Sequence, residues 1–147
     1  MNLPSFEYEL SQREDGVTRI YDRLRKTFVA LTPEEWVRQH FVNYLISERG
    51  YPGGLMANEV SLKLNSTARR CDTLVYSRTG KPVAVIEYKA PSIAVTQAVF
   101  DQIARYNSVI GAAYLMVSNG LSHYCCRYDE KSEGYVFLRD IPSYEEL

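Results

Sequence analysis

The first strong pattern in the sequence is that of an amphipathic helix that begins near residue 32. Thr32 is a favoured N-cap residue, Pro33 is favoured at the first helical position, and Glu35 completes a capping box. Apolar side chains then recur at helical spacing on one face, namely at Val37, Phe41, Tyr44 and Leu45. We expect this helix to end at Arg49 and Gly50, because glycine commonly terminates helices.

After this helix the apolar residues alternate with polar ones, which is typical of strands. Val60, Leu62 and Leu64 show the alternation most clearly. A later run of apolar residues at helical spacing predicts a second helix. The predicted elements, in order, are strands over 55–64, 71–76 and 83–89, a helix over 95–110, and strands over 113–118, 121–127 and 135–138.

The order of these elements predicts an α/β (α+β) fold with a mixed sheet: a core of helix, three strands, helix and strand, plus a C-terminal hairpin. A length of 147 residues favours a single domain. Residues 1–31 are expected to form a polar N-terminal arm with a short strand at Thr27–Ala30. Residues 32–128 would form the core, and residues 129–147 a C-terminal strand and tail.

The overall charge excludes a protein that coats nucleic acid through bulk electrostatics. The chain has 17 Lys and Arg against 18 Asp and Glu, for a formal net charge of −1. Any contact with nucleic acid therefore needs a partner chain or a local basic patch. The candidates for such a patch are Lys63, Arg69, Arg70, Arg78 and Lys81. The alternative is that these are ordinary charges that keep a hairpin soluble.

The cysteines and the apolar runs indicate a reducing, non-membrane setting. The three cysteines have no metal-site spacing, and we expect them to be small buried side chains. The longest apolar run, residues 109–117, is too short to span a bilayer, and the N-terminus has no signal-peptide pattern. A cytoplasmic location is expected.

The most distinctive chemistry lies at the end of the third predicted strand. Glu87 and Lys89 are two residues apart, so they lie on the same face of the strand. A turn centred between Thr79 and Gly80 would place Asp72 directly opposite Glu87. Two facing carboxylates repel each other, and Lys89 together with a divalent cation would offset that repulsion. The alternative is an exposed cross-strand charge cluster.

Such a cluster would suit phosphodiester hydrolysis. A Mg²⁺ or Mn²⁺ ion at Asp72 and Glu87 could polarise a phosphoryl oxygen and generate hydroxide, while Lys89 stabilises the developing charge. An acidic residue two positions before a lysine has low specificity by itself, and residues 129–131 repeat the pattern in a polar turn. The strand context and Asp72 distinguish the first occurrence.

The second helix adds two polar residues on one face. Gln102 and Tyr106 are four residues apart and could contact a phosphate or orient water near the metal site. The alternative is that Tyr106 belongs to the core and Gln102 is a solvated neighbour.

Together, Asp72, the Glu87–Lys89 triplet, and Gln102 with Tyr106 resemble the PD-(D/E)XK nuclease superfamily. The resemblance is narrower to the N-terminal nuclease module of type I restriction enzyme R subunits, in its stand-alone form, and covers roughly residues 20–145. It implies a restriction-endonuclease-like mixed sheet. It also implies DNA as partner, with other restriction-system subunits as further partners.

The resemblance also implies roles at the metal site. Asp72 and Glu87 would bind the metal, with the backbone carbonyl of Tyr88 as a further ligand. Relatives often add a glutamate from the first helix, for which Glu35 is the candidate, although the capping box already explains it.

The other roles are catalytic. Lys89 would be the catalytic lysine, and Gln102 and Tyr106 accessory catalytic residues. The sequence has no Walker-type motif, so a nuclease module without the helicase motor is expected. The first hypothesis is thus a Mg²⁺-dependent DNA endonuclease. The alternatives are a non-catalytic DNA-binding or assembly module with the same fold, and an unrelated metal-free domain in which Asp72 and Glu87 lie far apart.

Overall fold

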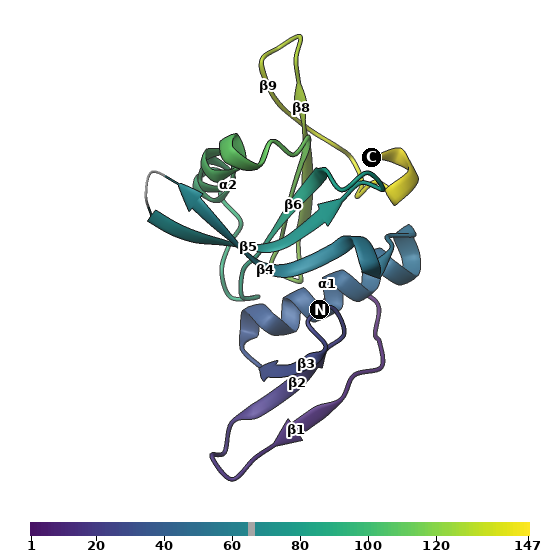
Figure 1. Cartoon of the computed structure of the whole chain (residues 1–147), viewed down its shortest axis with the longest axis vertical. Coiled ribbons are helices and arrows are strands. Elements are labelled where there is room, and N and C mark those ends of the chain that lie inside the picture. The colour runs from purple at the N-terminus through teal and green to yellow at the C-terminus, as the bar shows by residue number, and fades with distance from the viewer. Residues whose placement is uncertain (65–66) are drawn as a thin grey trace.

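The computed structural model describes residues 1–64 and 67–147, which form two sheets and two α-helices (Figure 1). The smaller sheet contains β1 (Leu10–Gln12), β2 (Thr18–Asp22) and β3 (Thr27–Ala30). The larger sheet contains β4 (Met56–Leu64), β5 (Thr67–Tyr76), β6 (Pro82–Tyr88), β7 (Tyr114–Ser118), β8 (His123–Asp129) and β9 (Gly134–Phe137). The helices are α1 (Pro33–Arg49) and α2 (Gln97–Ile110), with two short 3-10 turns, η1 (Gly53–Leu55) and η2 (Tyr144–Glu146).

The six strands of the larger sheet are paired in chain order, and their directions make the sheet mixed. All neighbours are antiparallel except β6 and β7, which are parallel. A parallel pair needs a crossover, and α2 supplies it. The predicted α/β (α+β) class with a mixed sheet is therefore confirmed.

The two helices cover opposite faces of this sheet. The Val37, Phe41 and Leu45 side chains of α1 pack with Ile86 and Met116 on one face. On the other face, Val99, Phe100 and Ile103 of α2 pack with Val85 and Leu115. Adjacent strand residues alternate between the two cores because side chains of a strand point to alternate faces. The end of β6 thus lies between both helices.

Both predicted helices are present, and the capping signals explain their ends. The Thr32 hydroxyl accepts the Glu35 N–H at 3.0 Å, with Pro33 at the first position. Gly50 adopts the left-handed conformation, with φ of 70°, and ends α1 after Arg49. The second helix begins at Gln97, two residues later than predicted.

The N-terminal arm is more ordered than predicted. Besides β3, it contains β1 and β2, which the short and polar sequence did not reveal. This small sheet lies against α1, on the far side from the larger sheet (Figure 1). It is anchored by the fully buried Ile20 and by Asp22, which is 1% exposed. The Asp22 carboxylate accepts hydrogen bonds from Arg25 and from Asn58 of β4, which joins the two sheets.

The C-terminal residues also pack against the core instead of forming a free tail. Ile141 and Tyr144 are buried, and the Tyr51 hydroxyl donates to the Pro142 carbonyl at 2.9 Å. All three cysteines are buried free thiols, as predicted. Within the part of the chain that the structure describes, no helix has the length and hydrophobicity needed to cross a membrane.

Candidate active site

The β5–β6 hairpin has the predicted register from Thr73 to Val75, although the register shifts by one residue between Val75 and Tyr76, next to the turn. Thr73 pairs with Ile86 and Leu74 with Val85, so Asp72 and Glu87 come next in the same register. On the other side of β5, Asn58 pairs with Thr73 and Val60 with Cys71, which leaves Glu59 opposite Asp72. Glu59, Asp72 and Glu87 therefore lie side by side on three neighbouring strands. We call these residues the acidic row.

Regular pairing stops at the acidic row. Glu59 has a φ of 57°, a left-handed conformation that costs a residue with a side chain about 1–2 kcal/mol. The β5–β6 ladder ends at Thr73, and the carboxylate of Asp72 takes the place of a backbone partner. Its Oδ2 accepts the Tyr88 N–H at 2.9 Å. This bond orients Asp72 toward β6.

Glu87 is held from the opposite side by α2. The Tyr106 hydroxyl donates to Glu87 Oε2 at 2.6 Å. Burial, followed by the negative charge of Asp72, raises the pKa of Glu87 from 4.5 to about 7. Burial also raises the pKa of Asp72, although the Tyr88 N–H opposes this shift. Each acid thus contributes to the environment of the other, as two neighbouring carboxyl groups in one buried site do.

Lys89 completes the cluster. It directly follows β6, and its N–H donates to the Ser118 carbonyl at 2.9 Å, which continues the pairing with β7. An open pocket of about 350 Å³ brings it together with the acids. The lining residues are Thr32, Glu34, Arg38, Glu59, Asp72, Glu87, Tyr88 and Lys89. The third hypothesis, which required Asp72 and Glu87 to lie far apart, does not describe this arrangement.

Arg38 of α1 forms the buried wall of this pocket. Its Nη1 donates to the Asp72 carbonyl and its Nη2 to Glu59 Oε1, both at 2.6 Å. The same guanidinium binds both oxygens of Glu35, at 2.9 and 3.1 Å. Arg38 thereby provides donors for one backbone acceptor, the Asp72 carbonyl, and for one side-chain acceptor, the Glu59 carboxylate, at the point where strand pairing is irregular.

Glu35 lies behind the pocket and does not line it. It is 4% exposed, and its carboxylate accepts hydrogen bonds from Arg25, Arg38 and Gln39. The glutamate that α1 contributes to the pocket lining is Glu34. The Thr32 hydroxyl accepts the Glu35 N–H, but the Glu35 carboxylate is directed to these three side chains, which hold it behind the pocket.

The two polar residues of α2 have different environments. Tyr106 is buried and bound to Glu87, whereas the Gln102 side chain is exposed and is not among the pocket-lining residues. The i, i+4 spacing puts both on one side of the helix. Of the two, Tyr106 is the one whose side chain contacts the acidic row.

Two residues of the site, Arg38 and Glu59, were not assigned to it from the sequence. Arg38 follows Glu35 at a spacing of three residues, which signals an intrahelical ion pair and nothing more. Glu59 lies inside a predicted strand, where no local pattern signals a left-handed residue. Glu59 is recognised only from the pairing of β4 with β5, and Arg38 only from the contacts of α1 with these strands.

The donors in the pocket suit a hard cation. The carboxylates of Asp72 and Glu87 supply oxygen ligands, and the Tyr88 carbonyl points to the same side of β6 as the N–H that binds Asp72. Mg²⁺ usually combines one or two carboxylates with water. Among residues 1–64 and 67–147, no three acidic, histidine or cysteine side chains converge on one metal position, so water would complete the coordination.

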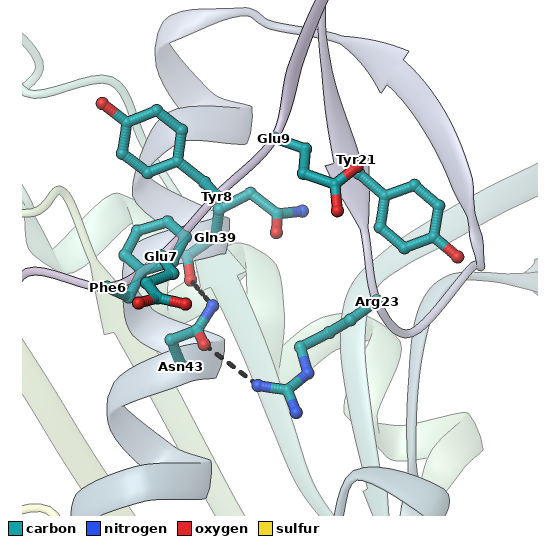
Figure 2. A pocket seen from close by; sticks show the side chains of 8 residues that line it. All are labelled: Phe6, Glu7, Tyr8, Glu9, Tyr21, Arg23, Gln39 and Asn43. Atoms are coloured by element: carbon teal, nitrogen blue, oxygen red, sulfur yellow. Dashed lines mark hydrogen bonds between the residues drawn. The ribbon is translucent and has the colours of Figure 1, made fainter.

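A second hollow lies between the N-terminal sheet and α1, on the other side of Glu35. Its volume is about 600 Å³, and Figure 2 shows the residues that line it. Arg23 donates to Asn43, and Asn43 donates to the Gln39 carbonyl. None of the predicted catalytic or metal-binding residues lines this hollow.

Comparisons with known proteins identify the family of the chain and a similar fold. The model of the family described as the type I restriction enzyme R protein N-terminus matches residues 33–142. A fragment structure described as the HsdR subunit of a type I restriction enzyme from Vibrio vulnificus YJ016 has a similar fold, with a TM-score of 0.56 and 21% identity. The match covers 80% of this chain and 24% of that chain, so this chain spans about a quarter of its length. Comparison with curated proteins gives no match.

The buried position of Arg38 predicts a large loss of stability when its charge is removed. In Arg38→Met, the carboxylates of Glu35 and Glu59 lose a buried cation, which should lower the free energy of unfolding by about 3–5 kcal/mol. Arg70 also approaches Glu59, at 3.9 Å, but its side chain is 70% exposed. Arg70→Met should therefore change stability by less than about 1 kcal/mol. Urea unfolding of both variants measures the difference, and equal effects would contradict the role given to Arg38.

The raised pKa of Glu87 predicts a defined dependence of stability on pH. Because its pKa is about 7 in the folded protein and 4.5 ordinarily, the folded state retains a proton that the unfolded state loses. The free energy of unfolding should then fall as pH rises from about 4.5 to 7. Between pH 5 and pH 8 the free energy of unfolding of the wild type should fall by about 1–3 kcal/mol more than that of Glu87→Gln.

Urea unfolding in a metal chelator, at both pH values, tests this dependence. Glu130 is exposed in the β8–β9 turn, so Glu130→Gln serves as the control. If Glu87→Gln and the control share the pH profile of the wild type, Glu87 does not have a raised pKa.

Proposed function

The chain belongs to the family of type I restriction enzyme R protein N-terminal domains, and from this premise we propose that it is a Mg²⁺-dependent nuclease module that hydrolyses DNA. In this proposal it cuts phosphodiester bonds within DNA and works with other restriction-system subunits. It would then also be a member of the PD-(D/E)XK superfamily. The observation that carries the proposal is the convergence of Asp72, Glu87 and Lys89 on one pocket.

The metal would be held by the carboxylates of Asp72 and Glu87, with the Tyr88 carbonyl as a further ligand. When bound, Mg²⁺ polarises a phosphoryl oxygen and lowers the pKa of a bound water. The chain's own contribution is to hold these ligands in place. The Tyr88 N–H orients Asp72 and the Tyr106 hydroxyl orients Glu87, so neither carboxylate has to reorganise when a cation arrives.

Lys89 would act on the substrate. In hydrolysis a water oxygen attacks phosphorus, the bond from phosphorus to the leaving oxygen breaks, and negative charge grows on the phosphoryl oxygens. The Lys89 ammonium lines the same pocket as both carboxylates, so it is placed to orient the water and to stabilise this charge.

The accessory role that the family resemblance implies applies to Tyr106 more directly than to Gln102. Tyr106 acts through Glu87 as a positioning residue. Gln102 is exposed and does not line the pocket.

A second candidate function is a non-catalytic DNA-binding or assembly module that retains the fold. The observation in favour of an assembly role is the charge of the pocket, whose lining holds four carboxylates, Glu34, Glu59, Asp72 and Glu87, against two cations and so repels a phosphodiester. The net charge of −1 adds to this argument. Metal binding separates the two candidates, because only the nuclease requires it.

Nicking of plasmid DNA in Mg²⁺ or Mn²⁺ tests the catalytic proposal. Lys89→Met removes one of the two cations of the pocket lining and should reduce nicking by about 10²-fold or more, as expected for loss of a group that stabilises transition-state charge. Lys131 ends the second acidic-x-Lys pattern, in the β8–β9 turn, and Lys131→Met should retain full activity. Equal activity of Lys89→Met and the wild type would remove Lys89 from the mechanism.

Calorimetric titration with Mn²⁺ tests the metal site without any need for activity. We expect binding of one ion, loss of that binding in Asp72→Asn, and affinity that rises as pH increases toward 7. The rise follows because Glu87, with its pKa of about 7, must release a proton when a cation binds. Absence of heat at millimolar Mn²⁺ would favour the non-catalytic module.

A further inference from the structure

The β4–β5 hairpin continues beyond the acidic row as an arm that carries only positive charge. Strand pairing runs on from Val60 and Cys71 to Lys63 and Ala68. Residues 60–71 contain Lys63, Arg69 and Arg70 and no acidic residue. In Figure 1 this hairpin extends outward from the body of the sheet, beside α2. We name residues 60–63 and 68–71 the basic arm.

We propose that the basic arm binds the DNA backbone beside the pocket; this deepens the proposed function and rests on it for the identity of the ligand. Ser61 pairs with Arg70 and Lys63 with Ala68, so Arg70 and Lys63 lie on the same face of the hairpin. Arg69 pairs with Leu62, whose side chain packs toward the α2 core, so Arg69 lies on the other face.

The spacing of the two cations on one face matches a phosphate backbone. Arg70 and Lys63 are diagonal neighbours in an antiparallel pair, with Cα atoms about 7–8 Å apart. Successive phosphates of one DNA strand advance about 3.4 Å along the duplex axis. The two side chains can therefore bind phosphates about two nucleotides apart.

The distance from the acidic row sets the position of these phosphates. Arg70 is two residues from Asp72 along β5, and the Lys63–Ala68 pair is four residues away. At about 3.3 Å per strand residue, the contacts lie roughly 7–13 Å from the pocket. The arm would thus bind backbone phosphates about two to four nucleotides to one side of the scissile bond.

The charges of the arm are available for a ligand. Lys63, Arg69 and Arg70 are exposed, and among the residues that the structure describes the one acidic side chain within 4.0 Å of any of them is Glu59, 3.9 Å from Arg70. A lysine on an edge strand protects against aggregation, and β4 is an edge strand. Arg69 and Arg70 lie on β5 beyond Thr73, where the ladder with β6 ends, so the two-stranded part of the hairpin presents arginine as well as lysine.

The remaining cations of the predicted patch lie elsewhere. Arg78 and Lys81 are in the β5–β6 turn, at the opposite end of β5 from the arm. Arg78 is bound to Glu145 at 3.0 Å and lies over the Tyr144 ring. The five candidates therefore divide into a group beside the pocket and a group remote from it.

An acidic pocket needs such a neighbouring group to attract a phosphodiester. The pocket lining holds four carboxylates and two cations. A phosphate that approaches it is repelled unless cations nearby offset this charge. The arm places the charges of Lys63 and Arg70 on one face beside the pocket, and that of Arg69 on the other face, without adding any acid.

Binding of a labelled 20-base-pair DNA duplex in Mg²⁺ tests this inference. The test compares Lys63→Gln/Arg70→Gln with Arg78→Gln/Lys81→Gln, each of which removes one lysine and one arginine. Both pairs are made in the Lys89→Met background, so that hydrolysis does not consume the duplex. The arm variant should bind about tenfold more weakly at 100 mM salt, and the slope of log affinity against log salt should fall by roughly 1–2 units. The turn variant should match its parent.

Equal losses in the two variants would show that only total charge matters, and absence of loss in both would remove the arm from DNA binding; either result overturns the inference. Binding of the protein to RNA that is tenfold tighter than to DNA, and that also depends on the arm, would show that DNA is not the ligand of the arm. The result is independent of catalysis. If the arm variant alone loses binding but the wild type never nicks DNA, the arm stands and the catalytic proposal fails. If the wild type nicks DNA but the arm variant binds DNA as tightly as its parent, the catalytic proposal stands and the inference about the arm fails.

Discussion

The site depends on the buried guanidinium of Arg38. Three acidic residues on neighbouring strands, two of them with irregular backbone pairing, would repel each other and leave a carbonyl without a donor. Arg38 reaches this point from α1 and donates to the Asp72 carbonyl and the Glu59 carboxylate. Its other contact, with Glu35, anchors it to the helix that covers the sheet. A buried cation with several acceptors offsets its own desolvation through these hydrogen bonds.

The irregular pairing has a consequence for Asp72. Where a regular antiparallel ladder would continue, the Tyr88 N–H instead binds the Asp72 carboxylate. The Tyr88 ring meanwhile is buried in the core beneath α1, and its hydroxyl donates to Thr73 at 2.9 Å. One residue thus connects the hydrophobic core to the acidic row. Core packing holds the backbone of Tyr88, and the backbone of Tyr88 orients the carboxylate.

The two helices hold the site from opposite faces of the sheet. Arg38 acts from α1 on β4 and β5, while Tyr106 acts from α2 on Glu87 of β6. Because each helix is packed by its own hydrophobic core, neither contact depends on a mobile loop. As a consequence, the carboxyl groups of the site have little contact with solvent. This burial favours the protonated form of Glu87 until a bound cation compensates the negative charge.

Local patterns in the sequence determined the elements and much of the hairpin register. The capping box at Thr32, the alternation in the strands, and the turn near Gly80 lie within short segments, so their physics is readable from neighbouring residues. They predicted both helices, the strands of the larger sheet, and the juxtaposition of Asp72 with Glu87. The first two strands of the N-terminal arm were missed because β1 has only three residues and a mixed polar pattern.

Only the tertiary structure decided which polar side chains meet at the site. In the sequence, Glu35 and Arg38 form a helical ion pair, and nothing distinguishes one of them as a site residue. The position of α1 on the sheet brings Arg38 into contact with the acidic row, while Glu35 lies behind it. Gln102 and Tyr106 share a helix face, yet only one lies over the sheet. Glu59 joins the site through a left-handed backbone that no residue type at that position requires. These outcomes come from contacts between segments far apart in the chain, and such contacts have no signature in any one segment.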